Sequence, residues 1–124
     1  MADSARALVI EDDDDIRLLL RMVLRQAGFS VETAATGEEG ASRAEGAEYD
    51  LITIDVGLPD IDGLEVARRI RPAFSGRIVI VSARASNADE SAGLAAGADL
   101  YIKKPFRPSE LRGAFENLMS TERS

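Results

Sequence analysis

The sequence predicts an α/β fold in which helices cover both faces of a parallel β-sheet. Short apolar runs rich in valine and isoleucine, typical of buried strands, alternate with segments of helical periodicity. This alternation occurs five times, which is the pattern of consecutive βα units. The chain has 124 residues, near the common size of one domain, and contains no repeat or low-complexity linker that would divide it.

The expected strands are of two kinds. Continuous apolar runs at 7–10, 49–54 and 77–81 predict strands buried on both faces of the sheet. Weaker apolar segments at 29–34 and 100–102 complete the set. Because a helical segment follows each of them, the five strands should lie parallel.

The helix after the first strand has the clearest pattern. Its apolar residues from Ile16 to Ala27 recur at the i, i+3, i+4 and i+7 spacing of an amphipathic helix, and Gly28 supplies a stop. The last helix shows the same periodicity and has Pro108 at its first position, where proline is tolerated best.

Three further helices are expected at 37–45, 63–71 and 87–96. The segment 87–96 is rich in alanine and glycine and poor in large apolar residues, so we expect this helix to be loosely held.

Composition argues against several classes of protein. The formal net charge of -7 disfavours direct binding of nucleic acid, because such a surface repels phosphate backbones. Neither cysteine nor histidine occurs, which removes disulfides, thiolate chemistry and the commonest metal ligand. No apolar stretch approaches the roughly 18 residues of a membrane span, and the N-terminus lacks the apolar core of a signal peptide. We therefore expect a cytoplasmic domain.

Chemically active side chains follow four of the expected strands. Glu11 and Asp12 end the first strand, and Asp55 ends the third. Ser82 ends the fourth strand, and Lys104 follows the fifth. Because ligands of parallel sheets bind at the carboxyl ends of the strands, these five side chains should meet at one edge of the sheet.

This set suits phosphoryl chemistry. The carboxylates of Glu11, Asp12 and Asp55 form an oxygen-rich pocket of the kind that binds Mg²⁺ or Mn²⁺. A lysine ammonium and a serine hydroxyl, from Lys104 and Ser82, match the outer oxygens of a phosphoryl group. An aspartate can attack phosphorus and hold the group as an acyl phosphate, and Asp55 follows the most apolar strand.

The sequence resembles the receiver domains of two-component response regulators from residue 7 to about residue 119. The matching segments, in order, read VIEDDDDIR, DLITIDVGLPDIDGLEV, IVIVSARAS and GADLYIKKPF. The resemblance implies a single receiver domain over 1–124 with a flavodoxin-like (βα)5 fold and strand order 2-1-3-4-5. The chain could be a complete regulator or one domain of a longer protein.

In this family reading, Asp55 accepts a phosphoryl group from the phosphohistidine of a sensor kinase or phosphotransfer protein. Asp12 holds Mg²⁺ directly and Glu11 partly through water, while Asp55 and the backbone carbonyl of Gly57 complete the protein's ligands. The domain acts as a switch and not as a metabolic enzyme, since it catalyses only its own phosphorylation and dephosphorylation.

The resemblance also implies a switch. Ser82 turns inward to the phosphoryl group that Lys104 contacts, and the ring of Tyr101 moves from solvent into the vacated space. This changes the face formed by the fourth helix, fifth strand and fifth helix, which contacts an output domain, a partner or a second copy in a phosphorylation-dependent homodimer. The bond between Lys104 and Pro105 is expected to be cis.

Two departures from the family pattern concern the loss of the phosphoryl group. Gly57 has no side chain to guide the water that attacks the phosphoryl group, whereas Arg84 could shield the phosphate from this water. The sequence leaves open whether the two residues together speed or slow dephosphorylation. A third departure is Leu100, which stands where many DNA-binding regulators have an acid, and it weakens the case for their charged dimer interface.

The acid run E-D-D-D-D at 11–15 divides into two functions. Asp13, Asp14 and Asp15 are interpreted as residues that begin the first helix, where acids favour the helix dipole and cap free N–H groups. Only the first two acids of the run are assigned to the metal site.

Three other functions stay open. A small-molecule phosphatase with an aspartate nucleophile normally needs a second acid two residues after it, and Gly57 occupies that position. A nucleotide-binding module would need a glycine-rich phosphate loop, which the sequence lacks. A pseudo-receiver would use the fold only as a protein-interaction module, and the full set of site residues argues against it.

Overall fold

A five-stranded parallel sheet forms the centre of the molecule, in the computed structural model that describes residues 5–121. Its strands are β1 (Arg6–Ile10), β2 (Ser30–Ala34), β3 (Leu51–Asp55), β4 (Arg77–Ser82) and β5 (Leu100–Lys103). Their order is β2-β1-β3-β4-β5, and every neighbouring pair is parallel. The α/β class and the strand order are therefore confirmed.

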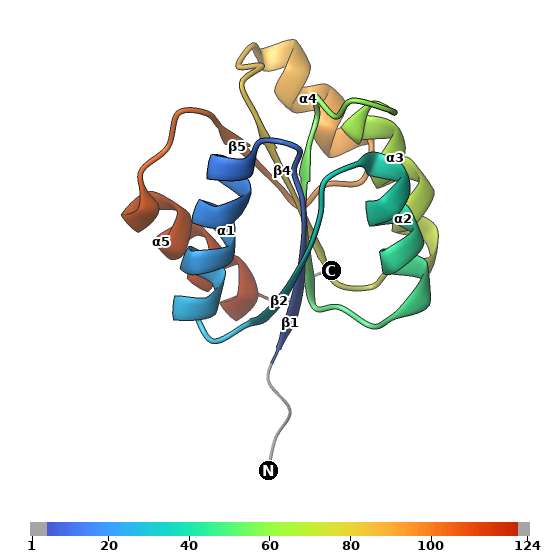
Figure 1. Ribbon diagram of the computed structural model, residues 1–124. Helices are drawn as coiled ribbons and strands as arrows, with labels where there is room; N and C mark the ends of the chain where they lie inside the picture. Colours follow the sequence, from blue (N-terminus) through green and yellow to red (C-terminus); the bar gives the residue numbers. More distant parts are fainter. Residues whose placement is uncertain (1–4, 122–124) are drawn as a thin grey trace.

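Helices cover both faces of the sheet (Figure 1). The helices are α1 (Asp14–Gln26), α2 (Gly37–Gly46), α3 (Gly63–Ile70), α4 (Asn87–Ala95) and α5 (Pro108–Ser120), with a short 3-10 turn η1 (Arg71–Ala73) after α3. Helices α1 and α5 lie side by side on one face, and α2, α3 and α4 lie on the other. The helix expected at 63–71 is α-helical only to Ile70. It continues as η1, which contains Pro72, a residue that has no N–H group to donate.

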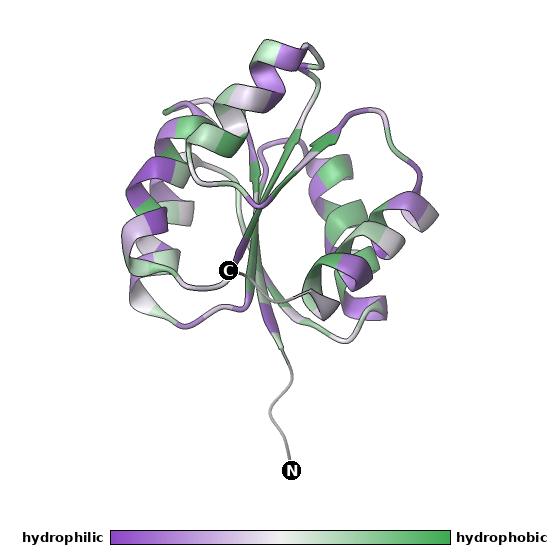
Figure 2. Ribbon diagram, turned by 180° about the vertical axis from the view of Figure 1, so that it is seen from behind, coloured by the Kyte–Doolittle hydropathy of each residue, from purple (hydrophilic) through white to green (hydrophobic). Residues whose placement is uncertain are grey.

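The core consists of two clusters, one on each face of the sheet. Alternate residues of a strand point to opposite faces, so Leu8 and Ile10 pack toward α2 and α3, whereas Ala7 and Val9 pack toward α1 and α5. The inner strands β1, β3 and β4 are accordingly mostly apolar (Figure 2). A sheet buried on both faces is a rigid frame for side chains at the strand ends.

The acid run bends into α1 as expected. Asp13 caps the helix, because its Oδ1 accepts a hydrogen bond from the N–H of Ile16 at 2.9 Å. Asp14 and Asp15 lie in the first turn, and Asp14 pairs with Arg17 at 2.5 Å. The interpretation of these three acids as helix-start residues is confirmed.

Helix α4 differs from the other helices in how little it buries. Gly93 is its one buried residue within Asn87–Ala95. Its start is fixed by Ser86, whose hydroxyl oxygen accepts from the N–H of Asp89 at 3.0 Å while the Asp89 carboxylate accepts from the Ser86 N–H. The helix is thus stabilised locally at its start, and few large apolar side chains hold it against the sheet.

Candidate functional site

The strand register brings the predicted site residues to one edge of the sheet. Ile10 of β1 pairs with Ile54 of β3, so Glu11 and Asp55, which follow them, are neighbours across the two strands. At the other side of β3, Asp55 pairs with Val81, the residue before Ser82. Ser82 in turn pairs with the residue before Lys104. Glu11, Asp55, Ser82 and Lys104 therefore follow one another across the ends of four strands.

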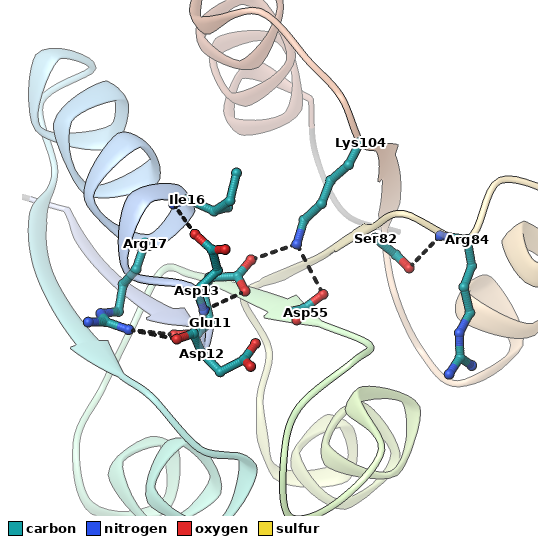
Figure 3. Close-up of polar contacts among 9 residues, drawn as sticks. All are labelled: Glu11, Asp12, Asp13, Ile16, Arg17, Asp55, Ser82, Arg84 and Lys104. Carbon is teal, nitrogen blue, oxygen red and sulfur yellow. Dashed lines mark hydrogen bonds and ion pairs between the residues drawn. The ribbon is translucent and has the colours of Figure 1, made fainter.

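Lys104 joins two of the carboxylates at this edge. Its Nζ lies 2.9 Å from Oε1 of Glu11 and 3.3 Å from Oδ1 of Asp55. Figure 3 shows the lysine side chain reaching toward both carboxylates from the end of β5. Glu11 is 1% exposed and Asp55 is 7% exposed. Since a buried charge without a partner is strongly destabilising, the ammonium compensates two acids that water cannot reach freely.

The pKa values of Glu11 and Lys104 are both raised above their usual values. Burial raises the pKa of Glu11 to about 7; the hydrogen bond from Lys104 opposes this, and the charge of Asp55 adds to it. Burial alone would lower the pKa of Lys104, but the hydrogen bonds and charges of Glu11 and Asp55 outweigh it, so this pKa is raised. Lys104 is therefore a stable cation, whereas Glu11 changes its charge near neutral pH.

The acidic side chains also form a group that fits a metal ion. Glu11, Asp12 and Asp55 each offer a carboxylate oxygen, and these oxygens lie within 4.8 Å of one another. Glu11 and Asp55 are buried, while Asp12 is exposed and opens the group to solvent. Oxygen donors of this kind select hard divalent cations such as Mg²⁺ and Mn²⁺. A divalent cation would also offset the mutual repulsion of the three carboxylates.

Two glycines shape the wall next to Asp55. A β carbon on Gly57 would lie 3.8 Å from Oδ2 of Asp55, so this residue borders the carboxylate without covering it. A β carbon on Gly63 would lie 2.1 Å from the backbone oxygen of Asp55, which is impossible without movement. The missing side chain lets α3 begin directly against the end of β3, where the N–H of Gly63 donates to the oxygen of Val56 at 3.0 Å.

Ser82 and Arg84 lie on the other side of Asp55 (Figure 3). Ser82 is buried, and its Oγ accepts a hydrogen bond from the N–H of Arg84 at 3.0 Å. That bond uses the oxygen as acceptor and leaves the hydroxyl proton for donation. The guanidinium of Arg84 lies 3.9 Å from the carboxylate of Asp62.

The switch residue expected from the resemblance, Tyr101, is buried in this structure, and the expected movement of its ring from solvent stays a prediction. Its hydroxyl donates to the backbone oxygen of Arg84 at 2.7 Å. The peptide bond between Lys104 and Pro105 is cis, as the resemblance implies.

Comparison with known proteins decides the family. The sequence model described as the response regulator receiver domain matches residues 7–116. This chain belongs to the response regulator receiver domain family. The receiver domain is 38% identical over 109 residues to the transcriptional regulatory protein ResD of Bacillus subtilis (strain 168), a match that covers 88% of this chain and 45% of ResD. The chain thus spans about half the length of this curated relative.

Solved structures agree with the receiver fold. The crystal structure of a response regulator receiver domain protein (CheY-like) from Methanospirillum hungatei JF-1 has a TM-score of 0.86 and 31% identity, with 95% of each chain covered. The BeF3-activated DrrB receiver domain has a TM-score of 0.87 and 27% identity, and the match covers 96% of this chain and 100% of that one. None of the helices in residues 5–121 is long and apolar enough to cross a membrane.

One residue near the site has a function that its sequence position did not reveal. Asp60 lies in the loop before α3, where an aspartate is usually a turn residue, but its two carboxylate oxygens accept hydrogen bonds from the N–H groups of Gly37 and Glu38, each at 2.8 Å. These bonds hold the pKa of Asp60 below its usual value. Asp60 thereby ties the loop after β3 to the start of α2, a contact across 22 residues that no local pattern indicates.

Proposed function

We propose that this receiver domain accepts a phosphoryl group on Asp55 from the phosphohistidine of a sensor kinase or phosphotransfer protein. One observation carries the proposal: the Asp55 carboxylate lies between a lysine ammonium, 3.3 Å away, and the acidic group within 4.8 Å. A nucleophilic carboxylate, a fixed cation and a set of oxygen ligands are the components that phosphoryl transfer needs.

The transfer exchanges one bond to phosphorus for another. A carboxylate oxygen of Asp55 attacks phosphorus, the bond from phosphorus to the imidazole nitrogen breaks, and that nitrogen keeps the electron pair. Lys104 pairs with the free carboxylate and afterwards with an oxygen of the phosphoryl group. Mg²⁺, held by Glu11, Asp12, Asp55 and the carbonyl of Gly57, would supply positive charge to the phosphoryl oxygens.

The output of the domain is a change of surface. The hydroxyl of Ser82 donates a hydrogen bond to the phosphoryl group, and Tyr101 occupies the space beside it, which alters the face formed by α4, β5 and α5. We propose that an output domain, a partner protein or a second copy of the chain reads this face in the cytoplasm. The domain is a switch that catalyses only its own phosphorylation and dephosphorylation.

Intact mass after incubation with acetyl phosphate tests the proposal. We expect one added phosphoryl group that requires both Mg²⁺ and Asp55, so that Asp55→Asn remains unmodified. Asp15→Asn removes an exposed acid of the same run and should be modified normally. If no adduct forms and beryllofluoride also fails to bind, the domain is a pseudo-receiver that only binds other proteins. An adduct that survives in Asp55→Asn would place the acceptor elsewhere.

A further inference from the structure

The ring of Tyr101 occupies a space between β4 and α4. Tyr101 belongs to the same buried cluster as Ile80 of β4 and Ala96 at the end of α4, and it is 7% exposed. Its hydroxyl reaches the loop between β4 and α4, where it donates a hydrogen bond to the backbone oxygen of Arg84 at 2.7 Å. The ring is thus fixed at its edge by packing and at its tip by a hydrogen bond.

The space for the ring exists because Gly93 has no side chain. A β carbon at this position would lie 2.6 Å from Cδ2 and 2.9 Å from Cε2 of Tyr101, and 3.2 Å from Cδ1 of Ile80. Real β carbons do not approach other atoms to 2.6 Å. Glycine is otherwise unfavourable inside a helix, because it loses more conformational freedom on folding than alanine does. At this position, glycine provides room for the aromatic ring instead.

Local hydrogen bonds keep the shape of α4 at both of its ends. Its first turn is fixed by the reciprocal bonds between Ser86 and Asp89. At the other end, the oxygen of Gly93 itself accepts from the N–H of Ala98 at 3.2 Å. Lys103 of β5 also lies 3.5 Å from Glu90 of α4. A β carbon at position 93 must be accommodated by a shift of the ring or of the whole helix, and the position of the ring distinguishes the two.

We propose that Gly93 is a positioning residue for Tyr101: it keeps open the space that the ring occupies between α4 and β4, and any side chain at position 93 drives the ring outward. Leu94, the one large apolar residue of α4, is exposed, so the helix packs a glycine against an aromatic ring that β5 supplies. An effect of Gly93 on switching rests on the proposed role of Tyr101 as the switch residue, whereas the packing of Gly93 against the ring does not.

Fluorine NMR of 3-fluorotyrosine can follow the ring directly. The chain contains two tyrosines and no tryptophan, so Tyr49→Phe leaves Tyr101 as the single labelled site. In this background we expect a small solvent isotope shift between H₂O and D₂O, typical of a buried ring. Adding Gly93→Ala should raise the isotope shift to that of an exposed fluorotyrosine. An unchanged isotope shift and an unchanged resonance in Gly93→Ala would overturn the proposal.

A double-mutant cycle supplies a second test. Gly113 of α5 is exposed, and a β carbon there would meet nothing within 4 Å, so Gly113→Ala is the matched control for a helical glycine. We expect Gly113→Ala to raise the urea midpoint of unfolding and Gly93→Ala to lower it. In a Tyr101→Ala background, Gly93→Ala should raise the midpoint as well. If Gly93→Ala changes the midpoint equally with and without the ring, Gly93 does not act through Tyr101.

Neither test uses a phosphoryl group, so its outcome is separate from that of the proposed function. Gly93→Ala should still accept one phosphoryl group from acetyl phosphate, because Gly93 is against Tyr101 and not against Asp55. Failure of labelling at Asp55 would leave the packing result intact, and an unmoved ring would leave the acceptor assignment intact.

Discussion

The buried carboxyl of Glu11 should make the stability of the metal-free domain depend on pH, and Glu11→Gln should remove that dependence. The pKa of Glu11 is raised from 4.5 to about 7 in the folded chain. Between these values the folded state binds more protons than the unfolded state, so the free energy of unfolding falls as pH rises through this window. Each pKa unit corresponds to about 1.4 kcal/mol, which gives a loss of up to about 3 kcal/mol by pH 8.

Urea denaturation from pH 4.5 to 8, with a chelator present, measures this effect. Glu11→Gln keeps the shape of the side chain and the acceptor for Lys104 but carries no charge. The variant should gain stability relative to the wild type as pH rises, and the difference should level off above pH 7. Glu48→Gln removes an exposed acid and should follow the wild type throughout.

Identical pH profiles for Glu11→Gln and the wild type would refute the reasoning. They would mean that Lys104 fully compensates the charge of Glu11, so that burial does not raise its pKa. Addition of Mg²⁺ should reverse the order of the two proteins at pH 8, because the ion needs the deprotonated carboxylate that the variant lacks.

Three other substitutions test separate parts of the structure. Asp12→Ala should weaken Mg²⁺ binding far more than Asp15→Ala in a calorimetric titration, and equal losses would mean that the acid run is divided wrongly. Gly63→Ala should lower the free energy of unfolding by roughly 2–4 kcal/mol, because the added β carbon would collide with the backbone oxygen of Asp55. An unchanged urea midpoint would contradict this prediction. Thr53→Val should raise the free energy of unfolding by about 1 kcal/mol, because the buried Oγ1 of Thr53 has no hydrogen-bond partner within residues 5–121. A loss of stability would instead indicate that this oxygen has a partner such as a buried water.

The fold, and the meeting of Glu11, Asp55, Ser82 and Lys104 at one edge of the sheet, could be predicted because the relevant signals are local. Neighbouring residues alone indicate the strands, through their apolar runs. They also indicate both ends of α1, through the acids at its start and Gly28 after its end. The alternation of strands and helices places the carboxyl ends of the parallel strands at one edge. The register, which only the structure shows, then puts Glu11 beside Asp55. The order of the strands, in contrast, came from the resemblance and not from periodicity.

The features that could not be predicted depend on contacts between distant segments. Asp60 resembles an ordinary turn residue, and nothing near it in the sequence indicates that it binds the start of α2. Gly93 resembles a helix-weakening glycine until the ring of Tyr101 is placed against it. Arg71 likewise gives no signal, although its guanidinium donates to the oxygens of Gly97 and Gly76 and thereby joins the loop after α4 to the loop before β4. Such contacts depend on tertiary packing, which a single sequence does not encode in any local pattern.

The most direct test of the central claim is to locate the phosphoryl group on the chain. After treatment with acetyl phosphate and Mg²⁺, borohydride reduction converts an aspartyl phosphate to homoserine, which peptide mass spectrometry then assigns to a position. We predict homoserine at position 55 alone. Homoserine at Asp12, Asp60 or Asp62, with Asp55 unmodified, would contradict the assignment of the acceptor and the account of the site built on it.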